Sequence, residues 1–254
     1  YLNNAGPSLT ISTGCASGNH AIGYGFDLIR DGEVKMAIVG GTDCVTSVMY
    51  GILDRVNTST PTCCKPFNAE RKGVLLGDGA AFLVLEEISH AIARKAEIYG
   101  EIFGYGLSCD AKHPTAPDKE GMANAIRKAL RSSKTQISGI DYIAMHGTGT
   151  ILNDITETEA VKHVFGKYSS KIATSSIKAM TGHTGGASGA VSAVSTFLAI
   201  KHGIIPPTIF LNRQDSKCDL NYTPNKCKKA EIKKAVINSF GFGGNNACVV
   251  LGAY

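Results

Sequence analysis

The sequence predicts an α/β fold in which largely buried strands alternate with helices. Six short runs have the apolar, β-branched composition of strands, and five longer segments place apolar residues at the i, i+3, i+4 spacing of a helix. Alternation of this kind is typical of sheets whose faces are covered by helices. The 254 residues are enough for one large domain or two modest ones.

The predicted elements follow one another without a Ser/Pro-rich linker or a low-complexity tract. In chain order they are a helix at 17–30, strands at 34–39 and 80–85, helices at 88–99 and 121–131, a strand at 140–145, a helix at 154–165, a strand at 172–175, a helix at 187–202, and strands at 235–239 and 247–251. Each strand is a short run rich in Val, Ile, Leu and Ala, and each helix has the 3.6-residue period.

Two of these helices begin with the same residues. Ala16-Ser17-Gly18 opens a helical stretch that ends at Gly32, and Ala187-Ser188-Gly189 opens another that ends at Gly203, in each case 14 residues after the first glycine. The match is either chance among many small residues or the trace of two related halves. In the second interpretation each half has a closely packed helix that opens on a reactive residue, Cys15 in one and His183 in the other.

Composition excludes several classes of protein. Charged residues make up 19% of the chain, which argues against disorder, and a net charge of +5 is too small to indicate nucleic-acid binding. No apolar run is long enough for a membrane span. The eight cysteines form no C-x-x-C pair or metal-ligand spacing, so we expect reduced thiols, no metal site and a cytoplasmic location. Because the chain begins at Tyr1, we also expect it to begin in the middle of a longer protein.

Cys15 is the strongest candidate nucleophile. It lies between a strand-like run and the first small-residue helix, in the segment Ser12-Thr13-Gly14-Cys15-Ala16. The N–H groups and the positive dipole end of a helix N-terminus favour a thiolate. The other seven cysteines are expected to be inert.

Three further segments carry candidate functional groups. His146 follows the strand at 140–145 and opens a Gly/Thr loop, at the end of a strand where α/β folds place reacting groups. Lys178 and His183 are five residues apart, just before the second small-residue helix. The glycine turn at 239–246 links two strands, and its backbone N–H groups suit an oxyanion hole.

With these four segments in order, the chain resembles the β-ketoacyl-carrier-protein synthases, which are condensing enzymes of the thiolase fold. The resemblance is carried by residues 13–18, by His146 to Thr150 with Asn153-Asp154, by Lys178 with Gly182-His183, and by residues 238–245, and it runs from about Pro7 to Leu251. The pattern of two histidines is similar to that of the elongating members of the family. The resemblance implies two related βαβαβαββ halves in α-β-α-β-α layers, with the first half truncated, and a boundary between residues 1–100 and 101–254.

The resemblance also implies a role for each matching residue. Cys15 would be the nucleophile, His146 and His183 would act on a malonyl thioester, and Lys178 would orient the site. The supporting residues would be Glu157, Phe242 in an oxyanion hole with the Cys15 N–H, and Asp110. The substrate would contact His113, Thr115, Thr148, Thr150, Phe240 and Gly243.

Three departures from the family pattern stand out. Gly14 takes the place of a usual alanine, and Ser192 that of an expected glutamate whose carboxylate would lie near Lys178. Only 14 residues precede Cys15, whereas family members have several βα units there. We therefore expect another segment or chain to supply the missing N-terminal strands.

The implied reaction is acyl transfer to Cys15 followed by decarboxylative condensation with a malonyl thioester. Its substrates arrive on the phosphopantetheine of an acyl carrier protein, so no resident cofactor is expected, and the family resemblance implies a homodimer or heterodimer. The alternatives are a non-catalytic, chain-length-setting subunit and an acyl-CoA thiolase. A lysine cluster at 226–234 either docks the acidic carrier or is a solvated surface.

Overall fold

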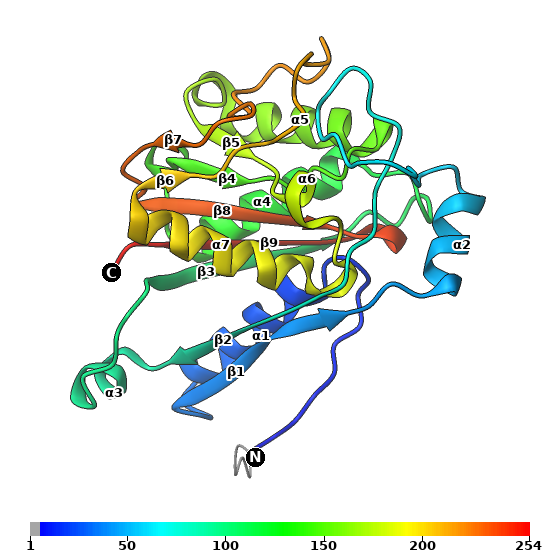
Figure 1. Ribbon diagram of the computed structural model, residues 1–254. Helices are drawn as coiled ribbons and strands as arrows, with labels where there is room; N and C mark the ends of the chain where they lie inside the picture. The colour runs from blue at the N-terminus through cyan, green and yellow to red at the C-terminus, as the bar shows by residue number, and fades with distance from the viewer. Residues whose placement is uncertain (1–5) are drawn as a thin grey trace.

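The computed structural model describes residues 6–254 and stacks them in four layers (Figure 1). The first layer is an antiparallel pair, β1 (Met36–Asp43) and β2 (Gly79–Glu86). Helices α1 (Ser17–Arg30) and α7 (Ser188–His202) separate this pair from a five-stranded sheet. Helices α4 (Lys119–Ser132) and α5 (Ile151–Phe165) cover the other face of that sheet. The predicted α/β fold is confirmed.

The five-stranded sheet places the candidate residues at one end. Its order is β3 (Glu101–Cys109), β9 (Asn245–Gly252), β8 (Lys234–Phe240), β4 (Tyr142–Ala144) and β5 (Ala173–Ser175). β4 runs parallel to β8 and β5, so its carboxyl end delivers His146 beside the carboxyl end of β8. β9 is antiparallel to both β3 and β8.

Shorter elements connect these layers. They are the helices α2 (Ser47–Arg55), α3 (Ile88–Ala93) and α6 (Lys178–Thr181), the small antiparallel pair β6 (Ile204–Ile205) and β7 (Lys228–Lys229), and single 3₁₀ turns at Ile137–Gly139, Gly166–Tyr168, Gly185–Ala187 and Phe242–Gly244.

Two hydrophobic cores lie on the two faces of the five-stranded sheet. Met122, Ile126 and Val161 pack from α4 and α5 against one face. Ile22 of α1 and Phe197 of α7 pack against the other. Burial on both faces explains why β8 and β9 are continuous apolar runs in the sequence.

The two small-residue helix starts are closely packed, as the sequence predicted, and the structure shows that they pack against each other. A Cβ on Gly18 of α1 would lie 2.7 Å from the Ala190 backbone nitrogen of α7, and a Cβ on Gly189 would lie 2.6 Å from Asn19 Oδ1. Each helix is also followed by an antiparallel strand pair, β1–β2 after α1 and β8–β9 after α7. This correspondence supports two related halves over chance.

Some predicted boundaries were wrong for local reasons. The helix predicted at 88–99 ends at Ala93, and Lys95 then adopts a left-handed φ of 59°. The helix predicted to begin at 121 begins at Lys119, because the Asp118 carboxylate caps it by accepting a hydrogen bond from the Gly121 N–H (2.9 Å). The helix predicted from 154 begins one turn earlier, at Ile151.

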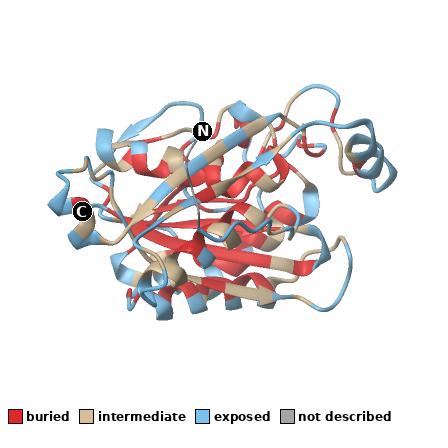
Figure 2. Cartoon of the chain, turned by 90° about the horizontal axis from the view of Figure 1, so that it is seen from below, coloured by how far each residue is buried: buried red, intermediate tan, exposed pale blue. Residues whose placement is uncertain are grey.

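The outer face of the β1–β2 pair is apolar and open to solvent. Ile38 is 47% exposed and pairs in register with Val84, which is 58% exposed, and Phe82 beside them is 57% exposed. Figure 2 looks onto this pair and shows exposed and half-buried positions in front of the buried strands of the larger sheet. The prediction of largely buried strands is therefore wrong for β1 and β2.

We expect residues 1–254 alone to self-associate through this face, because large exposed apolar patches on paired strands favour association. The double variant Ile38→Thr, Val84→Thr keeps β-branched side chains and removes apolar surface. Sedimentation velocity should show a larger monomeric fraction for this variant than for the unmodified chain. The matched control is Ile92→Thr on α3, which is 53% exposed. Equal monomer fractions in all three samples would contradict the prediction.

Among residues 6–254, no helix combines the length and the apolarity that crossing a bilayer requires.

Candidate active site

Cys15, His146 and His183 meet at one cavity of about 440 Å³. One ring nitrogen of each histidine and the Cys15 sulfur all lie within 4.8 Å of one another. The imidazole centroids are 5.4 Å apart and the rings are nearly perpendicular, at 84°. Cys15 and His183, which are more than 160 positions apart, thus share a single site with His146, as the family resemblance implied.

Cys15 sits in a tight elbow at the start of α1. Gly14 has a φ of 59°, in the left-handed region that favours glycine, and a Cβ there would have open space apart from the Phe242 carbonyl oxygen at 3.8 Å. The Ser17 hydroxyl donates to the Gly14 carbonyl (2.7 Å) and accepts from the Thr13 N–H (2.9 Å). These bonds hold the turn that directs the thiol into the cavity.

The environment of the thiol differs from the expectation of a favoured thiolate. Burial raises the pKa of Cys15 and outweighs the lowering effect of Lys178 and of two backbone N–H groups. Those N–H groups belong to Cys15 itself and to Phe242. Their convergence on the sulfur agrees with the oxyanion hole expected from the glycine turn.

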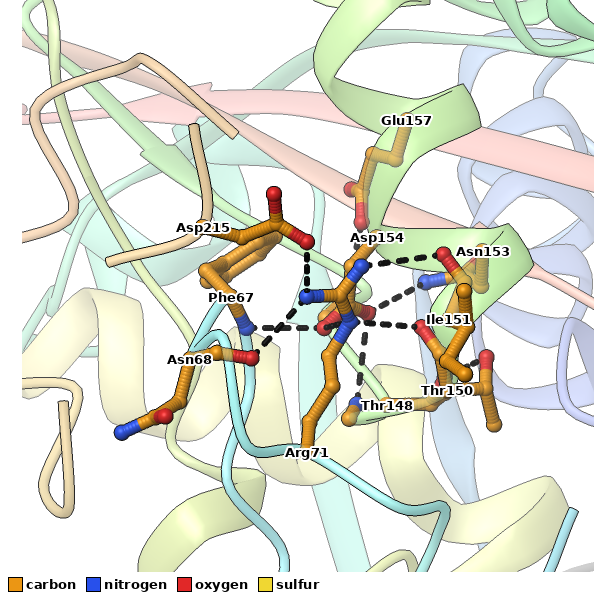
Figure 3. A network of polar contacts seen from close by, with 12 residues as sticks. Phe67, Asn68, Arg71, Thr148, Thr150, Ile151, Asn153, Asp154, Glu157 and Asp215 are labelled. Atoms are coloured by element: carbon orange, nitrogen blue, oxygen red, sulfur yellow. Dashed lines mark hydrogen bonds and ion pairs between the residues drawn. The ribbon is translucent and has the colours of Figure 1, made fainter. Parts of the chain in front are cut away.

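His146 is held from behind by a buried carboxylate on α5. Glu157 accepts hydrogen bonds from the N–H groups of His146 (2.7 Å) and Gly147 (2.8 Å), and from the Asn238 amide (3.0 Å). One helical turn earlier, Asp154 accepts from the Gly149 N–H (3.2 Å). Two acidic side chains of α5 therefore fix the backbone of the loop that carries His146, and Figure 3 shows both of them.

His183 has a defined tautomer. The Gly185 N–H donates to His183 Nδ1 (3.1 Å), so in the neutral ring Nε2 carries the proton. The backbone of His183 is bound on both sides, because its N–H donates to the Leu75 carbonyl (2.7 Å) and its carbonyl accepts from the Gly77 N–H (3.1 Å). The ring is thus oriented as a hydrogen-bond donor.

Lys178 is buried behind the histidines and does not line the cavity. Burial lowers its pKa, and Glu157 is the neighbour that opposes this most strongly. Burial likewise raises the pKa of Glu157. Glu157 is therefore the acidic neighbour of Lys178, while Ser192 lies buried on α7 in place of the expected glutamate.

The glycine turn and the loop after β3 are hydrogen-bonded to each other, and both line the cavity. Asp110 Oδ1 accepts from the Asn246 amide (2.6 Å) and Oδ2 accepts from the Asp118 N–H (3.0 Å). Burial raises the pKa of Asp110. The Gly243 N–H donates to the Pro114 carbonyl (2.7 Å), which ties the turn to the loop.

The remaining predicted substrate contacts have different outcomes. His113, Thr115, Thr148, Thr150, Phe240 and Phe242 line the cavity. Gly243 does not line it, and its N–H is already bound to the Pro114 carbonyl, so a substrate contact at Gly243 stays a prediction.

One wall of the cavity was not predicted from the sequence. Helix α2 contributes Met49, Ile52 and Leu53 to the lining, and Val56, which caps its C-terminus, adds a fourth apolar side chain. Their spacing of three, one and three residues is the signature of a helix face, so the signal was present in the sequence. The lining also includes Ile151 and Leu152, at the start of α5.

Proton placement opposes a metal ion at the Cys15, His146 and His183 donors. A metal on His183 Nε2 would require the ring proton to move to Nδ1, where it would face the Gly185 N–H. The buried Lys178 ammonium would also repel a cation, as its lowering effect on the pKa of both histidines indicates. The expectation of no metal site stays a prediction.

We expect both imidazoles to remain neutral well below pH 6.5. Burial is the main cause that lowers the pKa of His146 and takes that of His183 to about 3. The unfolded chain binds protons on these rings near pH 6.5, so their contribution to stability is complete above that pH and is lost as the pH falls. NMR of ¹⁵N-histidine-labelled protein, assigned with His146→Ala and His183→Ala, should show no titration of either ring between pH 8 and about 5. A midpoint near 6.5 for either ring would contradict this.

Comparison with known proteins agrees with this geometry. Residues 1–91 match the model of the beta-ketoacyl synthase N-terminal domain, and residues 99–212 match that of the C-terminal domain. The chain is 41% identical to 3-oxoacyl-[acyl-carrier-protein] synthase 2 of Synechocystis sp., aligning over 100% of this chain and 63% of that protein. It is 39% identical to nodulation protein E of Rhizobium meliloti, over 95% of this chain and 61% of that protein.

Solved structures show the same fold. The ishigamide ketosynthase/chain length factor superposes with a TM-score of 0.94 at 44% identity, over 97% of this chain and 61% of that chain. A type II polyketide ketosynthase in complex with its acyl-carrier protein superposes with a TM-score of 0.93 at 34% identity, over 96% of this chain and 62% of that chain.

The chain therefore belongs to the β-ketoacyl synthase family and has its thiolase-like fold. It spans about three fifths of the length of the curated relatives it matches.

Proposed function

We propose that the protein containing this chain is a 3-oxoacyl-[acyl-carrier-protein] synthase, an acyltransferase of fatty acid or polyketide synthesis. The observation that carries the proposal is the convergence of the Cys15 sulfur, two backbone N–H groups and two neutral imidazoles on one cavity. A nucleophile, an oxyanion hole and two donors for an enolate are what a decarboxylative condensation requires.

In the first half-reaction, Cys15 takes the acyl group from a thioester. The Cys15 sulfur forms a bond to the acyl carbonyl carbon, the carrier C–S bond breaks, and the thiol proton leaves with the carrier sulfur. The N–H groups of Cys15 and Phe242 are placed to stabilise the oxyanion of this step. A neighbouring group must accept the proton, because burial raises the pKa of the thiol.

In the second half-reaction, a malonyl thioester loses carbon dioxide. The electrons of the broken C–C bond form an enolate, whose oxygen accepts hydrogen bonds from His183 Nε2–H and from His146. The enolate carbon then attacks the acyl carbon, the bond to Cys15 Sγ breaks, and the thiol is reprotonated. Neutral imidazoles suit this role because they donate hydrogen bonds without protonating the carbanion.

The proposed substrates and partners follow from the same site. The apolar side chains of α2 form a wall suited to an acyl chain. Acyl and malonyl groups would arrive on the phosphopantetheine of an acyl carrier protein, so the reaction needs no resident cofactor. The dimeric state, homodimer or heterodimer, is part of the proposal.

The lysine cluster is poorly placed for docking the carrier. Lys228 and Lys229 form β7, at the end of the molecule opposite α2 and the cavity (Figure 1). A solvated surface is therefore the better interpretation of this cluster. If the Michaelis constant for the acyl carrier rises at low salt when Lys226, Lys228, Lys229, Lys233 and Lys234 become glutamine, docking occurs there after all.

The structure supports this proposal over the two alternatives. A thiolase needs a second reactive cysteine, but Cys248 is fully buried in β9, donates to Asn238 Oδ1 (3.3 Å), and has a pKa raised by burial. A non-catalytic subunit would not require Cys15, His146 and His183 to share one cavity.

The test is formation of product from two defined thioesters. Hexanoyl-carrier and malonyl-carrier incubated with the protein should give 3-oxooctanoyl-carrier, detected by mass spectrometry of the phosphopantetheine arm. Release of hexanoic acid alone would indicate a hydrolase, and the absence of any turnover with carriers of several acyl lengths would refute the proposal.

A further inference from the structure

The segment 67–77, which we name the strap, touches both histidine loops. At its start, the Phe67 N–H donates to Asp154 Oδ2 (2.8 Å), and Asp154 Oδ1 accepts from the Gly149 N–H in the His146 loop. At its end, Leu75 and Gly77 bind the backbone of His183. The strap belongs to the part of the chain matched by the N-terminal domain model, whereas both histidines belong to the C-terminal match.

Arg71 is the anchor of this strap. Its side chain is 2% exposed. Nη1 donates to Asp215 Oδ2 (2.6 Å) and to the Asn68 carbonyl (2.9 Å). Nε donates to the Thr150 carbonyl (3.2 Å), and Nη2 donates to the Ile151 carbonyl (3.1 Å). Figure 3 shows the guanidinium between these partners.

The guanidinium also compensates a buried charge. Asp154 is fully buried and its carboxylate lies 3.5 Å from Arg71 Nε. An unpaired carboxylate at this depth would be strongly destabilised, and Asp154 in turn holds both the Gly149 N–H and the strap. Arg71 therefore acts on the His146 loop twice, through the carbonyls of α5 and through Asp154.

We propose that Arg71 is a positioning residue that sets the relative placement of His146 and His183 by fixing the strap between their loops. This inference rests on the proposed function, because the two imidazoles must present donors to one enolate oxygen. It also predicts which half-reaction is sensitive. The Cys15 elbow, in contrast, is held by Ser17 and by the glycine turn, and within residues 6–254 the guanidinium of Arg71 bonds to other segments.

The variants Arg71→Gln and Arg71→Lys separate positioning from charge. Lysine keeps the positive charge but has no planar fork, so it cannot reach Asp215 and both α5 carbonyls together. Misplacement by about 1 Å costs on the order of 10²-fold in rate. We expect both variants to lose decarboxylation of malonyl-carrier by about this factor, and Arg71→Lys to unfold at a temperature closer to that of the wild type than Arg71→Gln does.

The measurements are carbon dioxide release from labelled malonyl-carrier, acylation of Cys15 by intact mass, and thermal unfolding. Acylation in the folded protein should remain largely unchanged. The control is Arg213→Gln, since the Arg213 side chain is 69% exposed and, within residues 6–254, its ion pair is with the exposed Glu70 at 3.5 Å. This control should match the wild type in all three measurements.

Several outcomes would overturn the inference. If both half-reactions fall together, or if Arg71→Lys restores rate and stability in parallel, Arg71 only maintains the fold. If Arg71→Gln does not fold, Asp215→Ala removes one acceptor of Nη1 and should slow decarboxylation selectively, and an unchanged rate would reject the inference. A wild-type protein that acylates Cys15 but never decarboxylates malonyl-carrier would instead refute the proposed function.

Discussion

Cys15→Ala is expected to form no acyl-enzyme while still releasing carbon dioxide from malonyl-carrier. Acyl transfer needs the sulfur as nucleophile, and without it no covalent intermediate can form. Decarboxylation needs donors to the enolate oxygen, and His146 and His183 keep their backbone anchors on Glu157 and Leu75 in this variant. Condensation should therefore fall below detection while some decarboxylation persists.

The two readouts for Cys15→Ala are intact protein mass after incubation with acyl-carrier, and carbon dioxide release from labelled malonyl-carrier. Cys227→Ala is the matched control, because Cys227 is exposed and lies in the chain just before β7, away from the cavity. The control should acylate and condense normally. An acyl adduct of full stoichiometry on Cys15→Ala would show that another residue is the nucleophile.

His183→Ala is expected to have the opposite effect. The variant removes the Nε2–H donor that the Gly185 hydrogen bond defines, and the loss of one such donor costs about 3–4 kcal/mol, or 10²–10³-fold in rate. Decarboxylation should fall by this factor, whereas acylation of Cys15 should continue at least in part. His146→Ala should behave in the same way if the two rings share the enolate oxygen.

The same two assays decide the role of His183. Thr181→Ala is a suitable control near it, because the exposed Thr181 hydroxyl bonds to the backbone carbonyls of Ile177 (3.3 Å) and Gly182 (2.8 Å) and to no site residue among those described. Should His183→Ala decarboxylate normally and fail to acylate, His183 would be the base for Cys15, and the roles proposed above would be exchanged.

The sequence was sufficient to single out the candidate catalytic residues, because each lies in a short motif with its own local signal. Cys15 lies between a small-residue helix and a positive-φ glycine, and His146 ends a buried strand. Motifs of this kind depend on neighbours along the chain, so they can be recognised without knowing the fold. The family resemblance implied that Cys15, His146 and His183 share one site, and the structure brings them together.

Elements whose stability comes from distant contacts were missed. β3 contains Gly104 and Gly106, which are poor strand formers, yet a Cβ on Gly106 would lie 2.3 Å from the Ala125 carbonyl oxygen of α4. Close packing of the helix onto the strand therefore requires glycine where propensity argues against a strand. Helix α2 was missed although the spacing of Met49, Ile52 and Leu53 carries a helical signal.

The protonation state and ion pairs of the site also could not be predicted from the sequence. The helix start at Cys15 favoured a thiolate, but burial dominates and raises the pKa of the thiol. Arg71 pairs with Asp154, 83 positions away, and with Asp215, 144 positions away. No local sequence pattern indicates either pairing.

The central claim is that one site accepts an acyl group on Cys15 and then condenses it with a decarboxylated malonyl unit. The most direct measurement isolates the acylated protein, free of acyl-carrier, and adds ¹³C-labelled malonyl-carrier. The account predicts that the adduct on Cys15 disappears in step with carbon dioxide release, and that the acyl carbons reappear in a 3-oxoacyl-carrier lengthened by two labelled carbons. Loss of the adduct as a free carboxylic acid, or its persistence while malonyl-carrier is decarboxylated, would contradict the account.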